Sequence, residues 1–123
     1  EWTVPLGRRF RALKLWFTLR AYGLDGLRSR IRNHVVWARD LASEIAAIPG
    51  LEIVTPPMLS LFSFAAGDDA ATRALLQRVN DDGRVYLTQT MRRGRFVIRV
   101  QVGQFDTTRE DVMTVARVLR DLL

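Results

Sequence analysis

The chain contains few side chains that could carry out covalent chemistry. Its 123 residues include no cysteine, one histidine and one lysine, and the other basic residues are 18 arginines. The lack of cysteine excludes a disulfide framework, a thiolate metal site and a thiol nucleophile. Lys14 is the only amine for Schiff-base chemistry, but its position between leucines favours a structural ion pair. His34 has no metal-ligand spacing around it, which is typical of a surface or half-buried structural histidine, and we expect no metal site.

One arginine is placed where it could bind an anion. In the last apolar run, alternate residues point to opposite faces of a strand. The core face would carry Phe96, Ile98, Val100 and Val102, and the opposite face Arg95, Val97, Arg99 and Gln101. The planar guanidinium of Arg99 suits bidentate capture of a carboxylate. On spacing alone, a solvated arginine on an open sheet face is equally expected.

The elements that must position these residues follow from the apolar periodicity. It predicts helices over 8–22, 24–48, 68–82 and 107–122, and strands over 51–54, 60–65, 85–91 and 95–102. Gly23 separates the first two helices, Pro56-Pro57 breaks the first strand, and Asp68 caps the third helix. Thr107 and Glu110 predict a capping box for the last helix. The fold class is α+β, a small antiparallel sheet covered by helices and approached by a long buried helix.

The positive charge is concentrated in the first third of the chain. Residues 1–39 hold nine basic and two acidic residues, a net charge of +7, whereas the whole chain has +6. This leaves open a free-standing binding module for nucleic acid or an acidic partner, although basic residues at helical spacing also suit a solvated helix face. No apolar run is long enough to span a bilayer and no leader begins the sequence, so we expect a cytoplasmic protein that does not bind membranes. The start at Glu1, without methionine, is typical of a piece of a longer protein.

Five segments of the sequence match motifs of one enzyme family. Residues 5–23, PLGRRFRALKLWFTLRAYG, closely resemble the P-L-G-R-R-F-R-x-L-K-L-W-F-x-x-R-x-Y-G segment of group II pyridoxal-phosphate-dependent amino-acid decarboxylases. The resemblance continues through 26–35, 75–88, 95–100 and 108–112, so it covers nearly the whole chain. It is strongest for the aromatic-L-amino-acid branch. The family's activity, removal of carbon dioxide from an aromatic L-amino acid to give its amine, is therefore expected of the full-length protein.

The resemblance implies a division of labour between this chain and the rest of such an enzyme. Residues 1–23 would be the end of the large domain and the connecting helix, and residues 24–123 the C-terminal small domain of a fold-type-I enzyme. The family's Schiff-base lysine lies in a Ser-x-x-His-Lys motif that this sequence lacks. The resemblance therefore implies no catalytic residue here, pyridoxal 5'-phosphate bound mainly by another region, no activity of the piece alone, and a homodimer in the full-length protein.

The same resemblance suggests roles for residues of this chain. Arg99 would bind the substrate carboxylate or anchor the catalytic loop. Gly7, Arg8, Arg9 and Phe10 would lie beside the pocket or the mobile loop, and a glycine at position 7 would leave room for a larger ring. A relative that forms an aldehyde instead of an amine is not distinguished, because the residues responsible lie outside this sequence.

Overall fold

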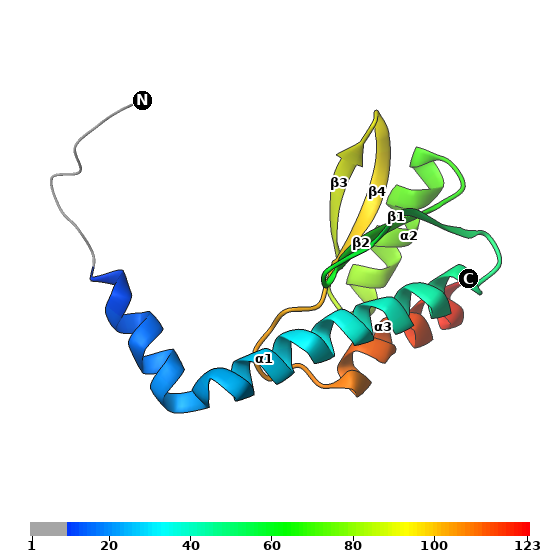
Figure 1. Ribbon diagram of the computed structural model, residues 1–123. Coiled ribbons are helices and arrows are strands. Elements are labelled where there is room, and N and C mark those ends of the chain that lie inside the picture. Colours follow the sequence, from blue (N-terminus) through cyan, green and yellow to red (C-terminus); the bar gives the residue numbers. More distant parts are fainter. Residues whose placement is uncertain (1–9) are drawn as a thin grey trace, which may run out of the picture.

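A four-stranded antiparallel sheet and three helices make up the part of the chain that the computed structural model describes, residues 10–123. The strand order in the sheet is β1-β2-β4-β3 (Figure 1). The elements are α1 (Arg11–Ala46), β1 (Leu51–Met58), β2 (Leu61–Ala66), α2 (Asp69–Asp82), β3 (Thr88–Arg92), β4 (Arg95–Gln101) and α3 (Arg109–Leu122). The expected α+β class is confirmed.

All three helices lie on one face of the sheet (Figure 1). On that face Phe62 of β2 pairs with Val100 of β4, and Phe64 pairs with Ile98. These four side chains are buried, and they form one core with the apolar sides of α1, α2 and α3. The predicted core face of β4, with Phe96, Ile98, Val100 and Val102, is confirmed. On the opposite face Arg99 and Gln101 are exposed, but Val97 is fully buried, so only part of that face is open.

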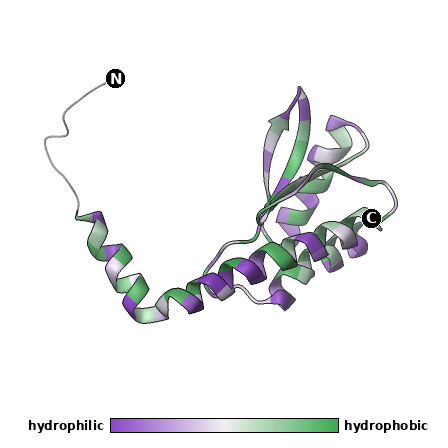
Figure 2. Ribbon diagram, viewed as in Figure 1, coloured by the Kyte–Doolittle hydropathy of each residue, from purple (hydrophilic) through white to green (hydrophobic). Residues whose placement is uncertain are grey.

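The break at Gly23 is confirmed, but the two predicted helices form one bent helix, α1. Gly23 has φ 67° and ψ 163°, a backbone conformation that is essentially restricted to glycine. Within the described residues the first half of α1 is not buried between layers of this chain, and its burial between two chains stays a prediction. Phe10, Trp16 and Phe17 are exposed because α1 before the bend projects away from the sheet, and its apolar residues are distributed along its length (Figure 2).

The first strand is longer than the sequence predicted. Pro56 and Pro57 do not break it, and β1 continues to Met58. A proline has no N–H to donate to a ladder, so it is tolerated on an edge strand, and β1 is the edge next to β2. Its register shifts between Ile53 and Thr55 and again between Thr55 and Met58.

Two further boundaries differ from the prediction. Thr108, not Thr107, caps α3, and its capping-box partner is Asp111, not Glu110. The Thr108 hydroxyl accepts a hydrogen bond from Asp111 N at 3.2 Å, and Asp111 Oδ2 accepts one from Thr108 N at 2.9 Å. Strand β3 begins at Thr88 instead of 85, because residues 85–87 are held by α2 as described below. The Asp68 cap of α2 is confirmed, with Ala71 N donating to its side chain at 2.8 Å.

Candidate functional site

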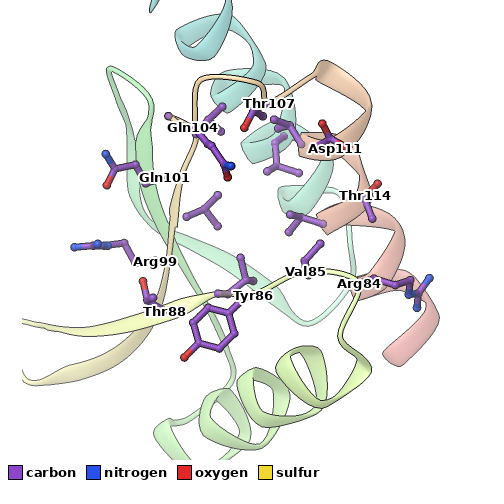
Figure 3. A pocket seen from close by; sticks show the side chains of 17 residues that line it. Arg84, Val85, Tyr86, Thr88, Arg99, Gln101, Gln104, Thr107, Asp111 and Thr114 are labelled. Atoms are coloured by element: carbon purple, nitrogen blue, oxygen red, sulfur yellow. The ribbon is translucent and has the colours of Figure 1, made fainter. Parts of the chain in front are cut away.

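An open groove of about 460 Å³ lies where the end of β4, the segment before β3 and the start of α3 meet (Figure 3). Its floor is apolar and is built by Leu41, Leu87, Val100, Val102, Val112 and Val115. Its rim is polar, with two arginines, Arg84 and Arg99, together with Thr88, Gln101, Gln104, Thr107 and Asp111. The apolar floor belongs to the core of the domain, so ligand recognition falls to the rim.

Arg99 stands at the edge of this groove, on the open face of the sheet. In the register of the sheet it pairs with Ser63 of β2 on one side and with Thr88 of β3 on the other. Both neighbours are short, and Ser63 Oγ donates a hydrogen bond to the Thr55 hydroxyl at 2.8 Å. Arg99 and Gln101 point away from the apolar side chains of the groove (Figure 3). The guanidinium is exposed and directed outward from the middle of a row of hydroxyl residues.

The two arginines of the rim differ in their partners. Arg84 donates to both carboxylate oxygens of Asp82, at 2.6 and 3.0 Å, and to Asp121 at 2.7 Å. The hydrogen bonds to Asp82 and then to Asp121 raise the pKa of Arg84 above its ordinary value, and Arg84 lowers the pKa of Asp82. Arg99 has no carboxylate partner among residues 10–123. Of the two, Arg99 is therefore the one available to an anionic group.

The wall of the groove before β3 is fixed by a residue that sequence reasoning did not single out. The Asn80 side chain accepts a hydrogen bond from Leu87 N at 2.8 Å and donates one to Leu87 O at 3.1 Å. These two bonds hold residues 85–87 against α2 in place of a strand partner. The signal available in the sequence was the asparagine in the last turn of a predicted helix, since this residue type commonly bonds nearby backbone.

A second polar residue that was missed lies between β2 and α2. The Thr72 hydroxyl is fully buried. It accepts a hydrogen bond from Ala66 N at 3.0 Å, and Asp68 O lies 2.8 Å from it as an acceptor. Thr72 therefore joins the first turn of α2 to the end of the central strand β2.

Among the described residues, Phe10, Lys14 and His34 do not line the groove. Gly7, Arg8 and Arg9 lie outside the described residues, whereas Phe10 is exposed at the start of α1. His34 is half-buried on α1, 5.7 Å between ring centroids from Trp37, as expected of a structural histidine.

The lysine does not have the environment that a cofactor lysine needs. Lys14 is exposed on the projecting half of α1, it does not line the groove, and it has no ion pair within residues 10–123, so the expected ion pair is not found there. The described residues therefore do not fit a pyridoxal-phosphate site by themselves. Over the same range, no group of three or more His, Asp or Glu side chains could hold a metal ion, and no helix is long and apolar enough to cross a membrane.

Comparison with known proteins identifies this architecture as part of an enzyme class. The crystal structure of Oryza sativa TDC with PLP and tryptamine superimposes with a TM-score of 0.87 at 31% identity, covering 96% of this chain and 27% of that one. The bent helix, the sheet and its helices are thus a segment found within a solved decarboxylase fold.

The sequence comparisons give the family. The family described as "Pyridoxal-dependent decarboxylase conserved domain" matches residues 1–66. The chain is 38% identical to tryptophan decarboxylase 2 from Oryza sativa subsp. japonica and 35% identical to phenylacetaldehyde synthase from Arabidopsis thaliana, each over 98% of its length. It belongs to the pyridoxal-dependent decarboxylase family. It spans about a quarter of these relatives, 26% of each.

Proposed function

We propose that this chain is the small-domain part of a longer pyridoxal-phosphate-dependent enzyme that decarboxylates an aromatic L-amino acid to its amine. The observation that carries the proposal is the similarity over 98% of the chain to enzymes named for this chemistry. The cofactor supplies the electron sink for loss of carbon dioxide. The only lysine of this sequence, Lys14, does not lie in the Ser-x-x-His-Lys motif of the family, so we assign the lysine that binds the cofactor to another region of the protein.

The part of the reaction assigned to this chain is recognition of a carboxylate. Arg99 projects from the sheet without an acidic partner within residues 10–123, whereas Arg84 on the same groove is neutralised by two aspartates. A guanidinium binds a carboxylate through two parallel hydrogen bonds, which fixes its orientation as well as its position. We therefore assign Arg99 to binding either the substrate carboxylate or an acidic residue of a catalytic loop. Phe10, with Gly7, Arg8 and Arg9, is proposed to lie beside the same pocket in a homodimer.

The alternative of a free-standing basic module receives less support. Of the basic residues at 10–39, Arg28 is paired with a carboxylate, Asp25. The positions of the early arginines also match the decarboxylase motif.

The test is product analysis on the full-length protein with added pyridoxal 5'-phosphate. Tryptophan, tyrosine, 3,4-dihydroxyphenylalanine, phenylalanine and glutamate are supplied separately, and amine, aldehyde and carbon dioxide are measured. We expect carbon dioxide and amine from an aromatic substrate. Aldehyde as the organic product would replace the decarboxylase assignment with an aldehyde synthase like the Arabidopsis relative, and no turnover of any substrate would refute the proposal.

The role of Arg99 is tested by Arg99→Ala and Arg99→Lys in the same enzyme, with Arg92→Ala as the matched control in the same hairpin. Loss of a charged hydrogen-bonding group that touches a carboxylate costs about 1.5–3 kcal/mol. This corresponds to a decrease of roughly 10- to 100-fold in kcat/KM at 1.4 kcal/mol per factor of ten. Lysine should recover only part of the loss, because it lacks the planar fork. Unchanged kcat/KM in Arg99→Ala would make Arg99 a surface residue only.

A further inference from the structure

The loop between β4 and α3 passes beside α1 (Figure 1). Phe105 of this loop contacts two residues of α1, Tyr22 and Arg30. The Phe105 ring lies 4.1 Å between centroids from the ring of Tyr22, the residue just before Gly23. Arg30, two turns further along α1, places its guanidinium carbon 4.3 Å from the Phe105 ring centroid and 5.4 Å from that of Tyr22. The same guanidinium donates a hydrogen bond to the backbone oxygen of Phe105.

This cluster joins the two halves of α1 that Gly23 separates. Tyr22 belongs to the half before the bend and Arg30 to the half after it, and Phe105 contacts both. Gly23 allows the bend, but no packing against the glycine itself fixes it, since a Cβ built there would meet nothing within 4 Å. The direction of the first half is therefore left to contacts made beside the bend.

Within the described residues, the cluster lies beyond the part of α1 that is anchored in the core. The buried residues of α1 begin only at Ala38 and end at Ile45. The ion pairs to α3, from Asp40 to Arg109 and from Glu44 to Arg120, lie in that same anchored region. Residues 24–36 have no fully buried side chain, and Arg30, which contacts Phe105, is half-buried.

We propose that Tyr22, Arg30 and Phe105 form a clamp that fixes the bend of α1 at Gly23. The clamp thereby sets how the chain before Gly23 is directed relative to the sheet. A guanidinium packed beside two aromatic rings that contact each other, with one N–H group on a backbone carbonyl, combines cation–π attraction with a directional hydrogen bond. The three residues act by positioning.

The clamp also connects the bend to the groove. Gln104, next to Phe105, and Thr107 line the groove whose edge carries Arg99. A bond that holds the Phe105 backbone therefore holds the adjacent groove wall as well. The pocket residues proposed at 7–10 precede α1 in the sequence, so the direction of its first half bears on where they come to lie. An effect of the clamp on turnover rests on the proposed function, whereas the clamp itself is independent of that function.

The test measures the bend directly in the full-length protein. Spin labels are placed at Lys14→Cys, on the exposed half of α1 before the bend, and at Gln89→Cys, on the exposed strand β3, in a background free of other reactive cysteines. Double electron–electron resonance then gives the distance distribution between the two labels. Because the full-length protein is proposed to be a homodimer, labelled chains are mixed with an excess of unlabelled chains, so that the two measured labels belong to one chain. The parent should then show one narrow maximum. Arg30→Ala and Tyr22→Ala should shift or broaden it, and so should Gly23→Ala, because alanine does not adopt the backbone angles of Gly23.

Two controls separate the clamp from general loosening. Tyr22→Phe keeps the ring and should retain the parental distribution, and Arg32→Ala removes an exposed arginine from the same helix and should also leave it unchanged. A parental distribution in both Arg30→Ala and Tyr22→Ala would overturn the proposal, as would an equal change in Arg32→Ala. Circular dichroism of each variant shows whether the domain is folded. A variant that is unfolded is replaced by Arg30→Gln, which keeps the length of the side chain without its charge and should still shift or broaden the distribution.

Steady-state kinetics of the same variants are interpreted separately. In an active enzyme, Arg30→Ala and Tyr22→Ala should lower kcat/KM while Tyr22→Phe restores it. If the parent decarboxylates none of the substrates, the proposed function fails and the distance distributions alone decide the clamp. If kcat/KM stays parental in variants whose distance distribution has changed, the clamp fixes the bend of α1 but has no effect on turnover, and that part of the proposal is overturned.

Discussion

Replacing Asn80 by alanine should release the wall of the groove without unfolding the domain. Asn80 makes two hydrogen bonds, at 2.8 and 3.1 Å, with the N–H and C=O of Leu87. At about 1 kcal/mol each, the pair is worth roughly 2 kcal/mol. Because 1.4 kcal/mol corresponds to a factor of ten, local opening of this segment should become about 30-fold more frequent.

Hydrogen exchange on the folded protein measures this opening locally. In Asn80→Ala, the amide of Leu87 should exchange about 30-fold faster when exchange follows local opening. Amides of β2 and β4, whose protection comes from the central strands, should keep the parental rate. Gln77→Ala is the matched control on the same helix, since Gln77 donates only to the exposed Asp81. The reasoning fails if Leu87 exchanges at the parental rate in Asn80→Ala.

Two further predictions concern stability. Thr72→Val keeps the shape of a fully buried side chain but leaves Ala66 N without its acceptor, which should lower the free energy of unfolding by about 1–3 kcal/mol. Thr18→Val, on the exposed half of α1, is the control and should change the free energy of unfolding by less than about 0.5 kcal/mol. Urea titrations measure both values. The hydrogen bonds from Thr108 lower the pKa of Asp111 below its ordinary value of 3.8. The ionised carboxylate therefore stabilises the start of α3 above pH 3.8, and this stabilisation is lost as the pH falls below 3.8. Asp111→Asn should therefore lower the free energy of unfolding at neutral pH and flatten its pH dependence below pH 3.8, measured by urea unfolding between pH 2 and 7. Parallel profiles for Asp111→Asn and the parent would contradict this assignment.

Local chemistry was enough to predict most of the fold. The core face of β4, the break at Gly23 and the cap at Asp68 each depend on a few neighbouring residues, and each is confirmed. The sequence also placed Arg99 on the face opposite the core, which its exposure confirms. Its role in binding a carboxylate stays a prediction, as does the domain boundary after residue 23.

The errors arose where an outcome depends on which strands become neighbours. Pro56 and Pro57 stop a strand only if their missing N–H groups are needed by a partner, and the edge position of β1 removes that need. The start of β3 was misplaced because residues 85–87 bond to Asn80, a contact between elements that periodicity does not reveal. The capping box shifted by one residue because Thr107 and Thr108 are each followed three residues later by an acid. Only the backbone geometry chooses between them.

The exposure of Arg99 determines how much it can contribute to recognition. An exposed guanidinium paired with a carboxylate gains only about 0–1 kcal/mol, because water screens both charges. The same pair shielded from water interacts more strongly. A buried guanidinium without a partner costs free energy, so a protein surface that covers Arg99 must bring an anionic group to it. The short side chains beside it, Ser63 and Thr88, leave space for such a group. Carboxylate recognition by this chain should therefore be weak while Arg99 is exposed to water and strong only where a further protein surface closes over it.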